Sequence, residues 1–330
     1  MIGTSQHYMG DLLSARRHLE RVLAHYVAPA EKSQIGRFEG GDQWAATRAY
    51  LARILWLQGF PDHAMRTAES SVADARETNH AISLGHALAL AACPIALFIG
   101  DLAAAEHYVE MLLDHSTSHA LARWRAIGRC YQGVLVIQRG DLSTGLRLLR
   151  AAFAEPAAAG SAPRLFTSLM AEALGRAGQI ADGLAAIEEA LARSERNEER
   201  WVVAELLRIK GELLLLQGGS RAAAAAEDHY QQGLDWARRQ GALSWELRAA
   251  TSLARLLYDQ NRSTEAMALL AAIYNRFTEG FETADLKAAK ALIDGFYNTE
   301  GTSRSPLMDA PPKTAAILEW SPRTERRRLA

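Results

Sequence analysis

Small and apolar residues recur along this chain at fixed distances from a series of turn residues. Each turn residue is a glycine or an asparagine, the residues that most readily end a helix and let the chain reverse. The turn residues are Gly10, Gly59, Gly100, Gly140, Gly178, Gly218 and Asn261. Around Gly178, an apolar segment (165–177) precedes the turn, and Gly183, Ile187 and Ala190 follow it at spacings typical of one helical face. This pattern predicts a pair of helices joined at each turn.

The same offsets from the turn carry the same kind of residue in successive repeats. Seven positions before the turn the residues are small: Ala52, Cys93, Gly133, Ala171, Gly211 and Ala254. Four positions before it they are apolar: Leu55, Ala96, Val136, Leu174, Leu214 and Leu257. Five positions after it they are small again: Ala15, Ala64, Ala105, Gly145, Gly183, Ala223 and Ala266. Small residues on facing helices let two backbones approach closely, so these positions predict the inside of a helical hairpin.

One repeat departs from this register. After Gly218 the apolar pattern of the second helix fits better three residues later, at Ala226, Tyr230 and Gly233. This shift predicts a short insertion in that turn.

The offsets resemble those of the tetratricopeptide repeat, a helical hairpin that stacks into a superhelix. From Gly59 onward the turns are 38 to 43 residues apart, whereas the standard repeat has about 34 residues. Each helix is therefore expected to be longer than in the standard repeat. The predicted fold is all-α, a tetratricopeptide-like α-α superhelix of about six to seven helical hairpins.

The periodicity predicts one elongated repeat domain, residues 1–297, and a disordered tail, residues 298–330. Residues 1–9 leave room for only a short helix before the first turn, so the first repeat is expected to be truncated. A capping helix is predicted over 283–297. Beyond it the pattern ends, and four prolines and three consecutive arginines (326–328) are typical of a solvated end.

The charge balance excludes a broad electrostatic footprint for nucleic acid or for an anionic membrane. The 330-residue chain has a net charge of −1 at pH 7, whereas such surfaces carry a clear excess of lysine and arginine. We therefore expect no direct nucleic-acid binding and no membrane binding by this region.

Cysteine usage and hydropathy predict a soluble, cytoplasmic protein. The two cysteines, Cys93 and Cys130, fall on predicted first helices and are interpreted as reduced, buried residues rather than a disulfide. The longest apolar run, 87–99, is shorter than a membrane span and contains Pro94. The chain does not start with the basic and then apolar pattern of a secretion signal.

The sequence contains none of the common catalytic motifs. The Gly-Gly pair at 40–41 is not followed by the Lys-Ser or Lys-Thr of a phosphate-binding loop, and neither a nucleophile elbow nor a zinc-binding helix is present. His115 and His119 have no third ligand nearby in the sequence and are interpreted as a solvated pair. We therefore predict no enzymatic activity, no metal and no cofactor.

Tryptophans mark the start of several predicted first helices. They are Trp44, Trp124, Trp201 and Trp245, each 15 to 17 residues before its turn. Packing between successive repeats is the favoured role, and an aromatic ligand cage is the alternative.

Several segments resemble a family of large bacterial regulators. They are residues 65–70, 92–97, 205–214, 243–257 and 277–290. Members of this family join a winged-helix DNA-binding domain or a class III adenylate cyclase domain to a predicted ATPase and then to tetratricopeptide-like repeats. The resemblance covers residues 3 to 297, the repeat region, and implies a regulatory or protein-interaction module that senses a partner or ligand. Two alternatives remain open: a C-terminal fragment of an enzyme encoded partly elsewhere, and a free-standing adaptor.

The resemblance to tetratricopeptide repeats also implies a concave groove lined by first helices. Six positions before their turns, the charged residues of this face are Arg53, Glu172, Glu212 and Arg255, and Arg208 lies ten before its turn. Charges on adjacent inner helices can form a hydrogen-bonding cluster for a peptide or a small polar effector. These five residues are the predicted binding site.

Overall fold

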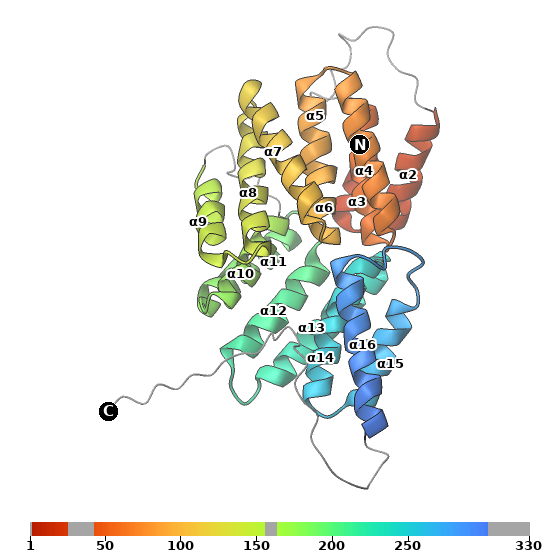
Figure 1. Cartoon of the computed structure of the whole chain (residues 1–330), viewed down its shortest axis with the longest axis vertical. Helices are drawn as coiled ribbons and strands as arrows, with labels where there is room; N and C mark the ends of the chain where they lie inside the picture. Colours follow the sequence, from red (N-terminus) through yellow and green to blue (C-terminus); the bar gives the residue numbers. More distant parts are fainter. Residues whose placement is uncertain (1, 26–42, 156–163, 303–330) are drawn as a thin grey trace, which may run out of the picture.

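The chain is built from antiparallel helical hairpins stacked in sequence order. The computed structural model describes residues 2–25, 43–155 and 164–302, and no strand occurs in these ranges (Figure 1). The first helices are α1 (Ile2–Met9), α3 (Gln43–Leu57), the run α5 (Ala81–Ala87), η2 (Leu88–Ala92) and α6 (Cys93–Ile99), α8 (Ala122–Gln138), α10 (Arg164–Arg176), α12 (Val203–Gln217) and α14 (Leu243–Asp259). Their partners are α2 (Leu12–His25), α4 (Pro61–Glu77), α7 (Leu102–Ser118), α9 (Leu142–Phe153), α11 (Ile180–Arg196), α13 (Ala222–Gln240) and α15 (Ser263–Tyr274), and α16 (Ala284–Thr302) follows. The predicted fold class, an all-α tetratricopeptide-like superhelix, is confirmed.

All seven predicted turn residues have a positive φ angle, which ends the preceding helix and lets the chain reverse. Their φ angles range from 64° at Asn261 to 101° at Gly140. Two of the following aspartates cap the next helix as Ncap residues should: Asp101 accepts a hydrogen bond from the N–H of Ala104 at 2.9 Å, and Asp141 accepts one from Thr144 at 3.0 Å. Turn chemistry in the sequence therefore locates the hairpins.

The helix after His80 contains a π-helical turn that the sequence pattern did not predict. Leu88–Ala92 forms this turn just before Pro94. Proline has no N–H to donate to the preceding turn of helix, and wider π turns are a common way for a helix to continue through such an interruption. The predicted helix is therefore present, with an irregular centre.

The same helix corrects the expectation about membrane spans. Ala81–Ile99 is 19 residues long, and in the described residues it is the one helix long and apolar enough to cross a bilayer. Its most apolar part is 72% buried inside the protein, in contact with α3, α4, α7 and α8. This burial is typical of a core helix.

The end of the chain differs from the prediction in one boundary. The capping helix α16 begins at Ala284 and continues to Thr302, past the predicted end at Tyr297. Residues 303–330, the rest of the predicted tail, lie outside the described residues.

The shifted repeat after Gly218 is confirmed. Helix α13 starts only at Ala222, and Ala226, Tyr230 and Gly233 are among its buried residues. The ring of Tyr230 packs against Gly211 of α12, where a Cβ atom would lie 2.9 Å from the Tyr230 Cδ1 atom. The longer turn therefore places the large ring of Tyr230 against Gly211, the position of α12 that has no side chain.

The N-terminal half of the superhelix, which includes α3 and α6, meets the C-terminal half, which includes α14 and α16. The contact is made by the first helices of the hairpins, which we call the inner helices. Trp56 of α3 stacks on Phe98 of α6 with ring centroids 4.2 Å apart, and Trp245 of α14 contacts Trp56 edge-on at 4.8 Å. The hydroxyl of Ser244 donates to the Trp56 carbonyl at 2.5 Å. In Figure 1, α14 and α16 accordingly lie directly beneath α3 and α6. Trp201 and Trp245 are each 1% exposed, in line with the predicted packing role. The prediction placed this packing between successive repeats, whereas Trp245 also contacts Trp56 of the distant second hairpin.

A second contact joins the halves at the surface. The backbone N–H of His63, at the start of α4, donates to Glu279 Oε1 at 2.9 Å, and Gly280 N–H donates to Asp62 Oδ2 at 3.0 Å. These residues belong to the second hairpin and to the loop before α16. The stack therefore curls until distant repeats touch.

Close helix approach makes an added methyl group destabilising in the fourth hairpin. A Cβ atom at Gly145 of α9 would lie 2.7 Å from the carbonyl oxygen of Gly133 in α8. Gly145→Ala should therefore lower the free energy of unfolding by about 1–3 kcal/mol. The matched change Gly295→Ala in α16, where a Cβ atom meets nothing within 4 Å, should raise it by up to about 1 kcal/mol. Urea unfolding checks both values, and a stabilising Gly145→Ala would contradict the close approach.

Candidate functional site

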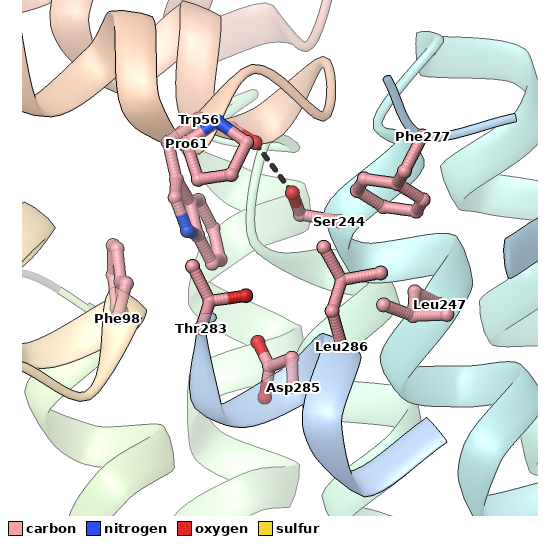
Figure 2. A pocket seen from close by; sticks show the side chains of 9 residues that line it. All are labelled: Trp56, Pro61, Phe98, Ser244, Leu247, Phe277, Thr283, Asp285 and Leu286. Carbon is pink, nitrogen blue, oxygen red and sulfur yellow. Dashed lines mark hydrogen bonds between the residues drawn. The ribbon is translucent and has the colours of Figure 1, made fainter. Parts of the chain in front are cut away.

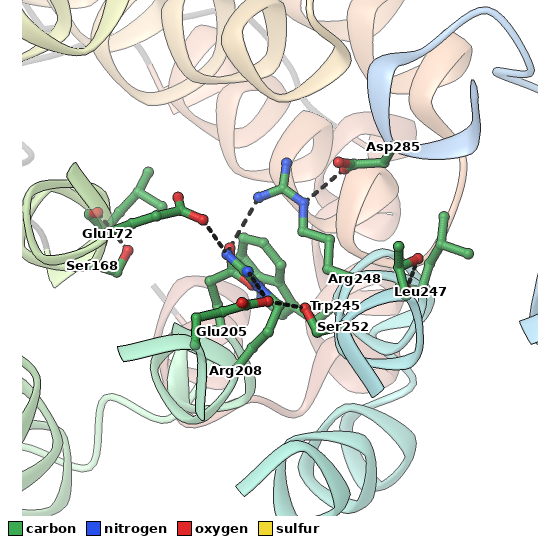
Figure 3. Close-up of polar contacts among 12 residues, drawn as sticks. Ser168, Glu172, Glu205, Arg208, Trp245, Leu247, Arg248, Ser252 and Asp285 are labelled. Atoms are coloured by element: carbon green, nitrogen blue, oxygen red, sulfur yellow. Dashed lines mark hydrogen bonds and ion pairs between the residues drawn. The ribbon is translucent and has the colours of Figure 1, made fainter. Parts of the chain in front are cut away.

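The structure brings three of the five predicted site residues together on the inner helices. Glu172 of α10 and Glu212 of α12 lie on either side of Arg208 of α12, whereas Arg53 lies elsewhere and Arg255 of α14 stays exposed. Figure 3 shows the resulting cluster of polar side chains. Residues at equal offsets in successive hairpins become neighbours here because the hairpins stack in register.

Arg208 is the centre of the cluster. Its guanidinium forms a bidentate pair with Glu205, with Nε to Oε2 at 2.8 Å and Nη2 to Oε1 at 2.9 Å. It also donates to Glu172 Oε1 at 3.0 Å and lies 3.7 Å from Glu212 Oε1. A planar guanidinium that contacts three carboxylates fixes their positions relative to one another.

Three further residues complete the network, and sequence reasoning missed all of them. Glu205 is 2% exposed and also accepts from Arg248 Nη1 at 3.1 Å. Arg248 in turn donates to Asp285 Oδ2 of α16 at 2.7 Å. The spacing of Glu205 and Arg208, three residues apart on one helix, is the signal that could have identified the first pair.

The network favours charged side chains although they are buried. Burial opposes ionisation of Glu205, but the adjacent Arg208 and Arg248 outweigh it and hold the pKa of the carboxyl below its usual value. Burial likewise opposes the charge on Arg208, yet Glu205 and Glu172 raise the pKa of the guanidinium well above its usual value. Both groups are therefore ionised at neutral pH.

Arg248 connects the network to the aromatic contact between the two halves. Its guanidinium carbon lies 5.3 Å from the Trp56 ring centre, 5.7 Å from that of Phe98 and 5.1 Å from that of Trp245. Cation–π contacts of this kind stabilise a guanidinium away from water. The charge network and the closure of the superhelix are therefore parts of one packed region.

The inner surface is filled where the halves meet. The cavity beside Trp56, Phe98 and Ser244 has a volume of about 10 Å³, room for a single water. Figure 2 shows the side chains that enclose it. A peptide or effector therefore needs a more open part of the inner face.

Such a part is the inner face that carries Glu172 on α10 and Glu212 on α12, and Arg255 occupies the same offset on the next first helix, α14. The first two side chains are 39% and 33% exposed. Glu212 Oε1 accepts from Ser252 Oγ at 2.6 Å, while Arg255 is exposed and forms no hydrogen bond or ion pair within the described ranges. We call these three residues the inner edge. It offers two positioned carboxylates and one available guanidinium.

Arg53 does not belong to this edge, contrary to the groove prediction. It is 6% exposed, and its guanidinium carbon lies 4.4 Å from the centre of the Trp201 ring. The sequence offset placed it correctly on the inner face of α3, but contact between the two halves covers that face.

The remaining candidates show no catalytic or metal-binding arrangement. Cys93 and Cys130 are free and buried, as predicted, and burial raises the pKa of both thiols, that of Cys130 to about 12. His115 donates from Nε2 to the Ala81 carbonyl at 2.8 Å, and His119 donates from Nδ1 to the His115 carbonyl at 2.9 Å. The described residues contain no group of three or more potential ligands placed to hold a metal ion.

A larger hollow of about 430 Å³ lies on the other side of the hairpins, between α4, α5 and α7. Its lining includes Arg76, Glu110 and Asp114, all of them exposed. The side chains around Arg208 differ from those that line this hollow, because buried hydrogen bonds hold them in place.

Comparisons with known proteins find similarity among solved structures. No protein-family description matches the chain, and no curated protein matches it. Among solved structures, the crystal structure of yeast Tom70 is similar, with 12% sequence identity and a TM-score of 0.47. The similarity covers 89% of this chain and 60% of that chain. A similarity at this level does not bear on function.

The buried network makes a prediction about stability. Glu205→Gln leaves Arg208, which is buried, and Arg248, which is partly buried, without their shared counter-charge. It should therefore lower the free energy of unfolding by about 3–5 kcal/mol. Glu172→Gln, at a partly exposed side chain, should cost less than about 1 kcal/mol. Urea unfolding at pH 7 compares the two, and equal effects would show that Glu205 does not hold the network together.

The same carboxylate sets the direction of a pH effect. Because the folded state lowers the pKa of Glu205, the contribution of this carboxylate to the free energy of unfolding is complete above the unfolded pKa of about 4.3. It is lost as pH falls below that value.

Replacing Arg208 by glutamate would add a fourth carboxylate to the three that Arg208 contacts. The Arg208→Glu variant should therefore unfold more easily than the wild type, because like charges in a buried cluster repel one another.

Proposed function

We propose that this chain is a non-catalytic protein-interaction module that senses a peptide or a small polar effector through the inner edge. Glu172, Glu212 and Arg255 contact the partner, and Arg208 holds the two glutamates in place. The observation that carries the proposal is the contact between partly exposed and buried charges. The side chains of Glu172 and Glu212 reach the surface, and both lie against Arg208, which is buried and paired with carboxylates. Binding groups that are fixed in advance lose less conformational freedom when a partner arrives.

The tetratricopeptide-like architecture supports this function. Stacked hairpins present side chains from successive first helices as a row, so one partner can contact α10, α12 and α14 at the same time. Charge-assisted hydrogen bonds to carboxylates and guanidinium groups are directional. The inner edge therefore selects a partner with a donor or cation for the glutamates and an acceptor for Arg255.

The proposed setting is a bacterial signalling or transcriptional regulator. The segments that resemble such regulators include residues 205–214 and 243–257, and these carry Arg208, Glu212, Arg248 and Arg255. In that setting, partner binding to the repeats restrains or releases a neighbouring ATPase domain. The nearly neutral charge and the two buried, free cysteines support a place in the cytoplasm.

Charge reversal at the inner edge tests the proposal. Peptides selected from a display library against the purified chain should lose at least tenfold in affinity for Glu212→Lys and for Arg255→Glu, because a charged hydrogen bond contributes about 1.5–3 kcal/mol. Arg66→Glu, at an exposed arginine of α4, is the matched control and should bind normally. Isothermal titration calorimetry measures the affinities.

Stability provides the second readout. Arg255 is exposed and forms no hydrogen bond or ion pair with the residues that the structure describes. Arg255→Glu should therefore change the free energy of unfolding by less than about 0.5 kcal/mol. Selected peptides that bind Arg255→Glu and Glu212→Lys as tightly as the wild type would place the interaction surface elsewhere.

A further inference from the structure

Helix α1 is joined to the distant C-terminal half by its last turn. The carbonyl oxygen of Tyr8 accepts hydrogen bonds from the backbone N–H groups of Arg200, at 2.7 Å, and Trp201, at 3.2 Å. Arg200 and Trp201 lie just before α12, so this contact connects the first hairpin to the sixth. We call it the α1 seat.

His7 lies in this seat, and its side chain is 0% exposed. Neither Nδ1 nor Nε2 makes a hydrogen bond with any residue in the described ranges. The rings of Tyr8, Tyr50 and Trp201 surround it, with centroids 5.3, 5.9 and 5.4 Å from that of the imidazole. A buried polar group without partners loses the hydrogen bonds it makes to water and gains none in return.

Other polar atoms at the same junction are also unpaired. Buried side-chain atoms of Gln6, His7 and Gln240 have no hydrogen-bond partner among the described residues. Gln240 packs against Gly10 and donates to the Arg200 carbonyl at 2.8 Å, which leaves its own Oε1 atom without a donor. The α1 seat therefore combines specific backbone contacts with poorly satisfied side chains, a combination typical of a segment that opens locally.

The surroundings of His7 oppose a positive charge. Arg53 and Tyr50 face it from α3, Tyr8 belongs to α1 itself, and Trp201 precedes α12. Burial and, after it, the charge of Arg53 lower the pKa of His7 well below its usual value, and no carboxylate in the described residues offsets them. The imidazole is therefore neutral while α1 is seated.

A released His7 regains the ordinary affinity for protons. Because the released state binds a proton below about pH 6.5 and the seated state does not, the seated state loses stability as pH falls through that value. The ratio of seated to released α1 changes by up to tenfold for each pH unit below 6.5. Above pH 6.5 both states are neutral and the ratio is constant.

We propose that α1 is an acid-released latch, in which protonation of His7 frees α1 from Arg200 and Trp201 and uncovers the inner face around Arg53. Release leaves the other hairpins folded, because the contacts within each of those hairpins do not include His7. The proposal is independent of the interaction function, since release takes place in the chain by itself.

Hydrogen exchange of the whole chain between pH 7.5 and 5, corrected for the intrinsic rate, tests the latch. The amides of residues 4–9, Arg200 and Trp201 should lose protection by up to tenfold per pH unit below 6.5, while those of α14 remain protected. His7→Phe removes the titrating group and keeps an aromatic ring, so this variant should show constant protection in the same range. His119→Phe, at an exposed histidine, is the matched control and should behave like the wild type.

Two outcomes would overturn the latch. One is that residues 4–9 keep their protection until the entire chain unfolds, which would make α1 part of the cooperative core. The other is that His7→Phe loses protection with the same pH dependence as the wild type, which would assign the effect to another group. If His7→Phe does not fold, His7→Gln replaces it, because glutamine does not titrate in this range. This variant should also show constant protection between pH 7.5 and 5, and a loss of protection like that of the wild type would contradict the latch.

Discussion

Close approach of paired helices through small residues is the constraint on which this structure depends. Where α8 and α9 cross, Gly133 and Gly145 face each other so tightly that a methyl group would meet backbone. Such contacts set the distance and angle within each hairpin. With short turns between them, the hairpins then have one way to stack, and their first helices form a common inner face. The position of every inner side chain follows from this arrangement.

Curvature brings that inner face into contact with itself. Trp56, Phe98 and Trp245 pack together although they belong to three different hairpins, and Arg248 lies against all three rings. A charged side chain in this place needs counter-charges, which Glu205 and Asp285 provide. The aromatic contact and the ion network therefore depend on each other, and together they occupy the space that an open superhelix would leave for a ligand.

The candidate site could be predicted in part. Glu172 and Glu212 share one offset from their turns, and equal offsets in stacked hairpins become neighbours in space, so the sequence was enough to pair them. Glu205 and Arg248 also share one offset, thirteen positions before Gly218 and Asn261, so the sequence could have paired them as well. Asp285 follows the last turn residue and has no such offset, so its contact with Arg248 depends on how α16 folds back. Arg53 shows the opposite case, because its offset predicted the correct helix face but not that Trp201 would cover it.

The sequence by itself determined the local and repeating features of this protein. Turn glycines, capping aspartates and small residues at fixed offsets act within one hairpin or between neighbours, so their effect can be read from spacing alone. Only the tertiary structure decided which surfaces of the superhelix are free. Small rotations between successive hairpins add up along the chain, and no single residue encodes their sum. For this reason His7 meets Trp201, and Trp56 meets Trp245, across nearly two hundred residues of sequence.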